Sequence, residues 1–278
     1  MITLEKLIIF DYSGTLSLEA PRFSRVENLV RALAETGLAA LGIATPEVFW
    51  DRIVNPTWVE GSTTRIGYKK VMAGRISALG LAPGIPDGEI EAAVSRFAER
   101  YLAESRIDPH WRPILSHIGA HPDTAVVVAT DHYAEATKAL IDFFQEWDIP
   151  AARISEGGNR ERALSGQKKT GTPSPVFIAN SADLGLWKAD RRFWKIVKSH
   201  LTPEGLRRLL LIDDFGFNEE AGDSYGERAK VAARREKTES VLREVFRTEV
   251  DAVPFFSAGE DLTRLIAEAS ARIDSFLK

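Results

Sequence analysis

The sequence contains no cysteine among its 278 residues, and this absence excludes several kinds of chemistry. Disulfide bonds, thiolate-bound metals and a cysteine nucleophile are impossible, and the sequence is silent about the redox compartment. An excess of positive charge is also missing, because 36 Lys and Arg face 40 Asp and Glu and the net charge is −4. This balance gives no electrostatic footprint for nucleic acid or an acidic membrane, so we expect neither partner.

Long apolar runs are absent as well. No run approaches the roughly 20 apolar residues that a membrane-spanning helix needs, and the N-terminus shows no basic leader followed by an apolar signal core. We therefore expect a cytoplasmic protein. Hydrophobic residues make up 44% of the chain and charged residues 27%, which is typical of a soluble globular protein that forms one large domain or a core with a smaller companion.

The sequence does contain a series of short apolar runs separated by helical patterns. We predict strands at Lys6–Phe10, Thr124–Ala129, Val176–Ile178, Leu209–Ile212 and Val253–Phe256. Continuous apolar runs of this length suit strands that are buried on both faces, and their alternation with helices indicates a parallel α/β sheet. Pro254 favours an edge position for the last strand.

The segment 18–113 differs from the rest because no strong strand pattern interrupts it. Helical patterns cover Phe23–Thr36, Pro46–Ile53, Thr63–Leu79 and Asp87–Glu104, with breaks at Asn55-Pro56, Gly80 to Pro86 and Asp108-Pro109. We interpret this segment as a helical insertion between the first and second core strands. The alternative is that these helices simply cover the sheet.

Three further segments lie in the second half of the chain. Helices at Glu227–Phe246 and Ala258–Leu277 have the apolar spacing of helices that pack on a sheet. Glu156 to Pro175 is rich in Gly, Ser, Thr, Arg and Lys and is predicted to be a surface loop. Its Arg160, Arg162, Lys168 and Lys169 could meet an anionic substrate, although a solvated loop is the simpler interpretation.

Four separated elements carry the chemistry. The first strand ends in Asp11, which opens Asp-Tyr-Ser-Gly-Thr, and Thr130 with Asp131 follows the second strand. Lys188 lies in Gly-Leu-Trp-Lys-Ala-Asp-Arg-Arg-Phe, and Asp213-Asp214 open Asp-Asp-Phe-Gly-Phe-Asn after another strand. Ligand sites in parallel α/β sheets lie beyond the carboxyl ends of the strands. Singly, each residue could be a helix cap, a turn residue or a solvated lysine.

Together, these four elements resemble the motifs of the haloacid dehalogenase-like (HAD) hydrolase superfamily, in order and spacing over nearly the whole chain. The first motif is an Asp followed by x-x-Gly-Thr, the second a Ser or Thr, the third a Lys and the fourth an acidic pair. Ala189 replaces the proline that usually follows the third-motif lysine. The resemblance implies a Rossmann-like α/β core of residues 1–17 and 114–278, with helices on both faces of a parallel sheet. It also implies an inserted helical cap domain of the C1 type at residues 18–113.

The resemblance also implies roles for individual residues. Asp11 would be the nucleophile and a ligand of Mg²⁺, which Asp213, Asp214 and the backbone carbonyl of Ser13 would also hold. Thr130 and Lys188 would bind the phosphate, beside Ser13, Gly14 and Asp131. The residue types suit these tasks, because Mg²⁺ prefers oxygen ligands and a carboxylate beside cations stays ionised. A lysine between phosphate and nucleophile would stabilise the transition state electrostatically.

One position departs from the phosphatase pattern. Ser13 occupies the place of the usual second Asp, which acts as general acid and base, and positioned acid–base catalysis is worth roughly 10²–10⁴-fold. The enzyme could be slow, or it could act on good leaving groups. Alternatively, His132 or a cap residue could supply the proton.

Two other branches of the superfamily lack an Asp at this position. Phosphonoacetaldehyde hydrolases have Ala there and form a Schiff base on a cap lysine, for which Lys69 and Lys70 are candidates. Haloacid dehalogenases have Tyr there and use no metal, and the intact acidic pair argues against that branch. Candidate substrate-facing cap residues are Trp58, Arg65, Tyr68, Lys69 and Trp111.

We therefore expect a Mg²⁺-dependent hydrolase of a small phosphorylated or phosphonate metabolite, acting through an aspartyl-phosphate. The alternative is a catalytically impaired member that binds phosphate, Mg²⁺ or a partner without efficient turnover.

Overall fold

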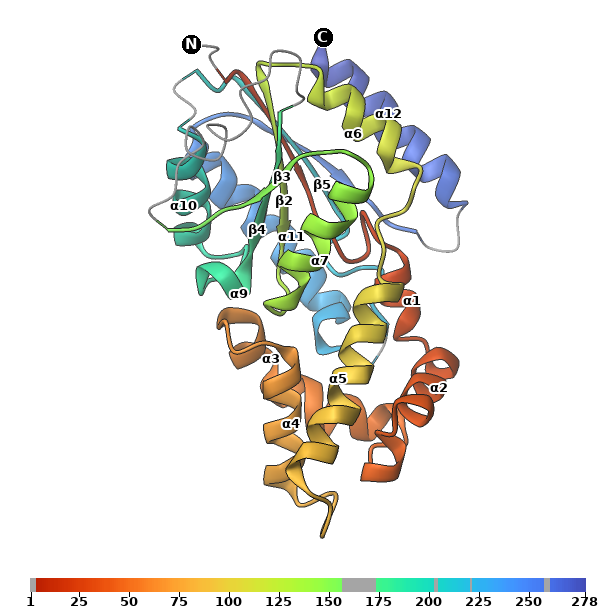
Figure 1. Cartoon of the computed structure of the whole chain (residues 1–278). Coiled ribbons are helices and arrows are strands. Elements are labelled where there is room, and N and C mark those ends of the chain that lie inside the picture. The colour runs from red at the N-terminus through yellow and green to blue at the C-terminus, as the bar shows by residue number, and fades with distance from the viewer. Residues whose placement is uncertain (1–3, 157–173, 203–204, 221, 258–260) are drawn as a thin grey trace.

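Six strands form the centre of the protein in the spatial order β3-β4-β2-β1-β5-β6 (Figure 1). The structure is a computed structural model, which describes residues 4–156, 174–202, 205–220, 222–257 and 261–278. The strands are β1 (Lys6–Phe10), β2 (Thr124–Thr130), β3 (Ala151–Arg153), β4 (Val176–Asn180), β5 (Arg208–Asp213) and β6 (Val250–Pro254). Each pair of neighbours is parallel, which confirms the predicted fold class.

The sheet is covered on both faces because its strands are apolar on both sides. In the central strand β1, Ile8 and Phe10 belong to one apolar cluster, while Leu7 and Ile9 belong to another. This division follows from the two-residue period of a strand. The first cluster includes side chains of α6 (Trp111–Gly119), α7 (Glu135–Glu146) and α12 (Leu262–Leu277). The second includes side chains of α10 (Arg191–Leu201) and α11 (Arg228–Phe246). Two short helices, α9 (Ser181–Leu184) and η3 (Ser224–Gly226), complete the described part of the core.

The two ends of the sheet differ in detail from the sequence-based expectation. The sequence analysis missed β3, because it has only three residues and none of them is fully buried. The last strand, β6, begins three residues before the predicted Val253 and includes Asp251, which lies outside the predicted strand. It pairs only with β5 among the described strands, so the edge position predicted from Pro254 is confirmed.

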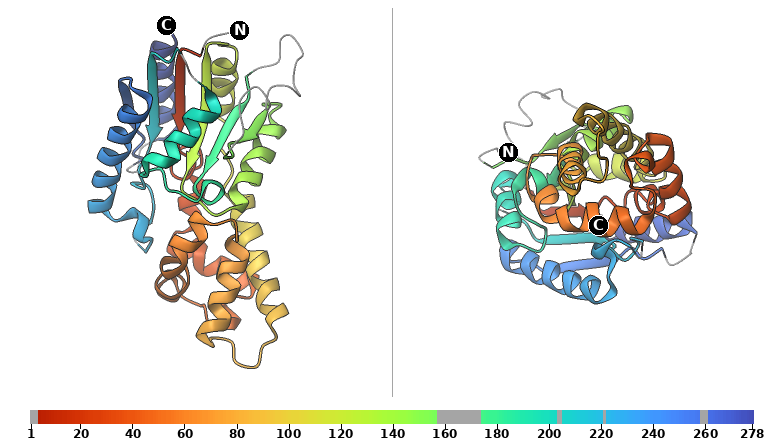
Figure 2. Two further views of the ribbon diagram at one scale, coloured as in Figure 1. Left: turned by 90° about the vertical axis from the view of Figure 1, so that its left-hand side faces the viewer. Right: turned by 90° about the horizontal axis from the view of Figure 1, so that it is seen from below.

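Helices alone occupy the described chain between β1 and β2. They are α1 (Glu19–Phe23), α2 (Val26–Thr36), η1 (Ala39–Leu41), η2 (Val48–Val54), α3 (Asn55–Thr63), α4 (Tyr68–Leu79), α5 (Asp87–Glu104) and α6. Residues of the segment from α1 to α5 form a third apolar cluster, which Tyr133 of the core joins. In Figures 1 and 2, α2 to α5 project as a separate body beyond one end of the sheet, where they cover the carboxyl ends of the strands. Trp111, at the start of α6, instead packs in the first core cluster.

The expected break at Asn55-Pro56 is not a break. The chain runs through a π-helical stretch, η2, directly into α3. Pro56 lies in the first turn of α3, where the fixed φ of proline suits a helix. The predicted helix Phe23–Thr36 corresponds to α2, which begins only at Val26, while Phe23 is the last residue of α1. The predicted helix Thr63–Leu79 begins only at Tyr68.

Most of the predicted loop Glu156–Pro175 lies outside the described residues, including Arg160, Arg162, Lys168 and Lys169. None of the helices in the described ranges combines the length and the apolar character that a membrane crossing requires.

Candidate active site

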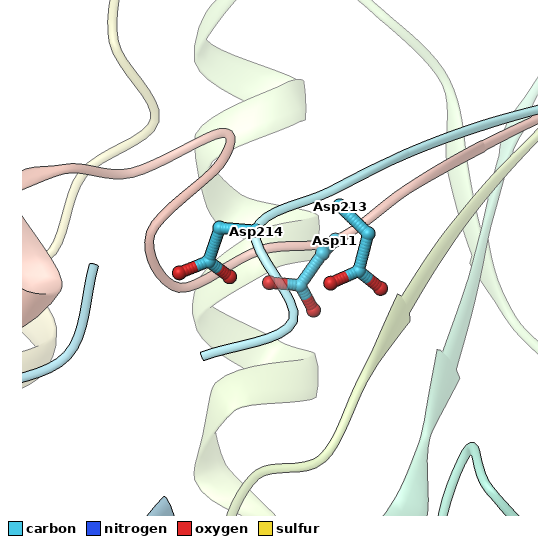
Figure 3. A group of neighbouring side chains, drawn as sticks. All are labelled: Asp11, Asp213 and Asp214. Atoms are coloured by element: carbon cyan, nitrogen blue, oxygen red, sulfur yellow. The ribbon is translucent and has the colours of Figure 1, made fainter. Parts of the chain in front are cut away.

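Three carboxylates meet at the carboxyl edge of the sheet (Figure 3). Asp11 directly follows β1, Asp213 ends β5 and Asp214 comes next. The strands are in register, with Phe10 opposite Ile212, so Asp11 and Asp213 reach the same level of the sheet. One oxygen of each carboxylate lies within 4.8 Å of the others, and all three residues are buried. The chain therefore builds one buried acidic cluster from two distant segments.

Lys188 places an ammonium inside this acidic cluster. Its Nζ donates to Asp11 Oδ1 at 2.5 Å and to Asp213 Oδ2 at 2.9 Å. Its backbone N–H donates to Asp131 Oδ1, and its carbonyl accepts from Trp194 Nε1. Burial by itself lowers the pKa of Lys188, but Asp11 and Asp213 outweigh burial and hold this pKa well above its ordinary value. Lys188 is therefore charged and fixed in place.

Asp214 is positioned by backbone groups. Its Oδ1 accepts from the Gly216 N–H at 3.1 Å, and its Oδ2 accepts from the Asn218 N–H at 2.8 Å. Gly14, with φ of +78°, passes so close that a Cβ at this position would lie 2.4 Å from Asp214 Oδ2. A glycine satisfies both the positive φ and the close approach. Position 14 therefore requires a glycine because any larger residue would collide with the Asp214 carboxylate.

The acidic cluster has three carboxyl groups, which Lys188 alone cannot balance if all of them ionise. Burial, reinforced by the neighbouring Asp213, raises the pKa of Asp214 to about 8. Burial also raises the pKa of Asp11 despite the Lys188 ammonium. Buried negative charge is costly unless it is paired, and Mg²⁺ takes carboxylate oxygens as ligands. The donor set of Asp11, Asp213 and Asp214 therefore fits Mg²⁺, and these three residues would hold it.

Thr130 and Asp131 come from the neighbouring strand β2. Thr130 is its last residue and lines the same cavity as Asp11. Asp131 Oδ1 accepts the Lys188 N–H, and its Oδ2 accepts from the Tyr225 hydroxyl at 3.1 Å. Asp131 therefore links the backbone of Lys188 to the side chain of Tyr225. The structure brings both predicted residues to the site, and their contact with phosphate stays a prediction.

A glutamate that the sequence analysis missed lies beside Ser13. The Ser13 hydroxyl donates to Glu219 Oε1 at 2.7 Å, and both residues line the cavity. Burial, with the nearby Asp223, raises the pKa of Glu219 to about 8. The only signal in the sequence is the pair Glu219-Glu220 directly after the fourth motif, and no spacing rule connects that pair with Ser13. The structure thus supplies a carboxyl group next to the position where phosphatases carry their second Asp.

His132 is a poor source of the missing proton. Its Nδ1 accepts from the Tyr133 N–H at 2.8 Å, so the proton of the neutral ring lies on Nε2, 3.0 Å from the Tyr101 hydroxyl. Burial lowers the pKa of His132 to about 4. The ring is therefore neutral near pH 7 and occupied on both sides.

The two candidate Schiff-base lysines do not reach the cavity. Lys69 forms an ion pair with Glu99, with 2.6 Å between Nζ and Oε1, and Lys70 is exposed. Neither of them lines the cavity.

A cavity of about 730 Å³, counted out to its mouth, extends from Asp11 into the helical body. Aromatic side chains from that body supply much of its lining: Phe49, Trp50, Trp58, Tyr68, Phe97 and Tyr101. Of the five candidate substrate-facing residues, the cavity therefore includes Trp58 and Tyr68. Arg65, Lys69 and Trp111 do not line it, and Arg65 instead donates to the Asp183 carbonyl at 2.9 Å.

Comparison with known proteins gave matches only among solved structures. No family model and no curated protein matches the sequence. A 2-haloacid dehalogenase from Pseudomonas syringae pv. Tomato DC3000 is 17% identical, with a TM-score of 0.45 over 80% of this chain and 83% of the other. The putative HAD-hydrolase YfnB from Bacillus subtilis, described as bound to magnesium, is 14% identical, with a TM-score of 0.38 over 80% and 85%. Identities and TM-scores this low leave the function to be argued from the site.

Proposed function

We propose that this protein is a Mg²⁺-dependent, HAD-like hydrolase that cleaves a small phosphate ester through an aspartyl-phosphate on Asp11. One observation carries the proposal: Asp11, Asp213, Asp214 and Lys188, which are distant in sequence, share one buried cluster, and Asp11 of this cluster lines a cavity. Burying three carboxylates and an ammonium is unfavourable for stability alone unless they are well paired. A functional use of these charges explains their retention.

The proposed reaction has two steps. A carboxylate oxygen of Asp11 attacks phosphorus, the bond from phosphorus to the leaving-group oxygen breaks, and that oxygen takes up a proton. Water then attacks the phosphorus of the aspartyl-phosphate, which releases inorganic phosphate and regenerates the carboxylate. Lys188 and the Thr130 hydroxyl would hold the phosphate oxygens. Bound Mg²⁺ would offset the negative charge shared by the phosphate and the carboxylates, with the Ser13 carbonyl as a further predicted ligand.

A phosphate ester is favoured over a phosphonate that reacts through a Schiff base. That chemistry needs an amine facing the substrate, and neither Lys69 nor Lys70 lines the cavity. The alternative is a protein that binds phosphate, Mg²⁺ or a partner but is impaired in catalysis. Its support comes from Ser13, which cannot act as a carboxylic acid near neutral pH. The Glu219 carboxyl beside Ser13 weakens that alternative.

The test is phosphate release from a panel of small phosphate esters, measured with Mg²⁺ and with excess chelator. We expect release that requires Mg²⁺ and is abolished by Asp11→Asn, which keeps the shape of the side chain and removes its charge. Asp123→Asn, at the opposite end of the sheet, is the matched control and should leave the rate unchanged. Turnover by the parent protein no greater than that of Asp11→Asn, or equal turnover in chelator, would contradict the proposal.

A further inference from the structure

The part of the cavity away from Asp11 has aromatic walls that hold one another in place. Tyr68 and Tyr133 stack with ring centroids 4.2 Å apart. Trp58 meets Tyr133 and Tyr225 edge-on, at centroid distances of 5.3 and 5.8 Å. We call these four residues the aromatic pocket. Since both the helical body and the core contribute rings, the aromatic pocket forms where the two parts of the protein meet.

The charged side chains that line the cavity beside the aromatic pocket are all acidic. Besides Asp11 and Asp131, the cavity is lined by the carboxyl groups of Glu219 and Asp223, and no Lys or Arg belongs to its described lining. Arg234 acts electrostatically on both Glu219 and Asp223, but its guanidinium stacks on the Tyr225 ring and donates to the carbonyls of Phe215 and Tyr225. Two carboxyl groups therefore face the cavity without an ion-pair partner among the residues described.

A hydroxyl inside the aromatic pocket also lacks a partner. The Tyr133 side chain is 5% exposed, and its Oη makes no hydrogen bond to any group in the described part of the chain. Burial and the nearby Asp223 carboxylate raise the pKa of Tyr133, so it remains a neutral donor and acceptor. Unpaired buried polar groups are rare in proteins because they cost free energy. Tyr133 lines the cavity, although its Oη is itself covered by the described residues.

On the basis of the function proposed above, we propose that the aromatic pocket, together with Glu219 and Asp223, binds a cationic alkylammonium leaving group of the phosphate ester. The faces of Trp and Tyr rings attract ammonium groups, and the attraction is strongest where water is excluded. An anionic leaving group would meet carboxylates and no basic side chain. A neutral apolar one would give neither carboxyl group a partner for its ionised form.

Two esters of nearly identical shape test this assignment. They are 2-(trimethylammonio)ethyl phosphate and 3,3-dimethylbutyl phosphate, which differ by one positive charge. With Mg²⁺ present, we expect kcat/KM of the parent protein to be at least about tenfold higher for the cationic ester. Mg²⁺-dependent hydrolysis of both esters with equal kcat/KM would overturn the leaving-group assignment and leave the hydrolase function standing.

Two variants test whether Asp223 contributes to the preference for the cationic ester. Asp223→Asn removes charge but keeps a side chain that can cap η3, as Asp223 does through the Tyr225 N–H. It should lower the ratio of the two kcat/KM values about three- to tenfold. Glu220→Gln is the control, because Glu220 is outside the cavity lining and pairs with Arg25. Equal ratios in the two variants would overturn the assignment.

Calorimetry with tetramethylammonium chloride, against potassium chloride at the same ionic strength, separates the two proposals. We expect binding by the parent protein and by Glu220→Gln, and about three- to tenfold weaker binding by Asp223→Asn. If neither ester is hydrolysed but this pattern of binding holds, the cation site stands and the hydrolase function fails. If tetramethylammonium does not bind the parent protein, the cation site is refuted whatever the activity.

Discussion

Replacing Gly14 with alanine should destabilise the protein by two separable effects. The first is backbone strain, because Gly14 has φ of +78°, and a side chain in left-handed backbone costs roughly 1–2 kcal/mol. The second is steric, because the new Cβ would lie 2.4 Å from Asp214 Oδ2 and only 2.7 Å from its Cγ. The carboxylate must move, although two backbone N–H groups hold it.

The size of the steric effect follows from those two hydrogen bonds. Above the Asp214 pKa of about 8, where this carboxylate is charged, a hydrogen bond to it contributes roughly 1.5–3 kcal/mol, so losing one adds that amount to the strain. Gly14→Ala should therefore lower the free energy of unfolding by about 2.5–5 kcal/mol in total. Gly84→Ala is the matched control, since Gly84 has φ of +79° and a Cβ added there would meet no atom within 4 Å. It should lose only the strain, about 1–2 kcal/mol.

Urea unfolding of the two variants and the parent protein in chelator measures both losses. The difference between the variants isolates the contact with Asp214. If Gly14→Ala and Gly84→Ala lose the same free energy of unfolding, Asp214 can move at no cost. The argument that Gly14 positions this carboxylate would then be refuted.

Two further predictions concern the charges of the acidic cluster. Burial raises the pKa of Asp214 from an ordinary 3.8 to about 8. The folded protein therefore binds the Asp214 proton more tightly than the unfolded chain does. Without metal, the free energy of unfolding should fall as the pH rises from about 4 to about 8. Urea midpoints at pH 6 and pH 8 should show this fall without Mg²⁺ and much less of it with saturating Mg²⁺; a metal-free protein more stable at pH 8 would contradict it. Lys188→Met leaves the buried carboxylates of Asp11 and Asp213 without their ammonium partner. In chelator, we expect the free energy of unfolding to fall by about 3–5 kcal/mol. Mg²⁺ should restore part of this loss, and the variant should release no phosphate. Lys70→Met, at an exposed position, is the control, and an equal loss in both variants would contradict the role of Lys188.

The convergence of the acidic cluster could be predicted because it depends on strand ends. The runs that form β1 and β5 are apolar on both faces, and both end in Asp at the carboxyl edge. A parallel sheet places these ends together whatever the chain between them does. The edge strand β3 offered no such signal, because a three-residue strand that is only partly buried needs no apolar pattern.

The helical body was predictable as a set of helices but not in its boundaries. Pro56 suggested an end to a helix, yet a proline in a first turn also suits the start of α3, and the local sequence does not distinguish the two. The aromatic lining was hidden for a related reason. Trp58 and Tyr68 look like ordinary helix residues until the packing of one helix on another decides which side faces the cavity.

The Ser13 departure shows where motif comparison and structure differ most. A motif comparison considers only which residue stands at position 13, so Ser13 there means that a carboxylate is missing. In the folded protein, however, Glu219 from another segment places its Oε1 2.7 Å from the Ser13 hydroxyl oxygen. The short serine leaves room for that side chain, whereas an Asp at position 13 would bring two carboxylates together, which is unfavourable unless they share a proton. Ser13 and Glu219 are therefore better understood as one paired arrangement than as a missing acid and an unrelated glutamate.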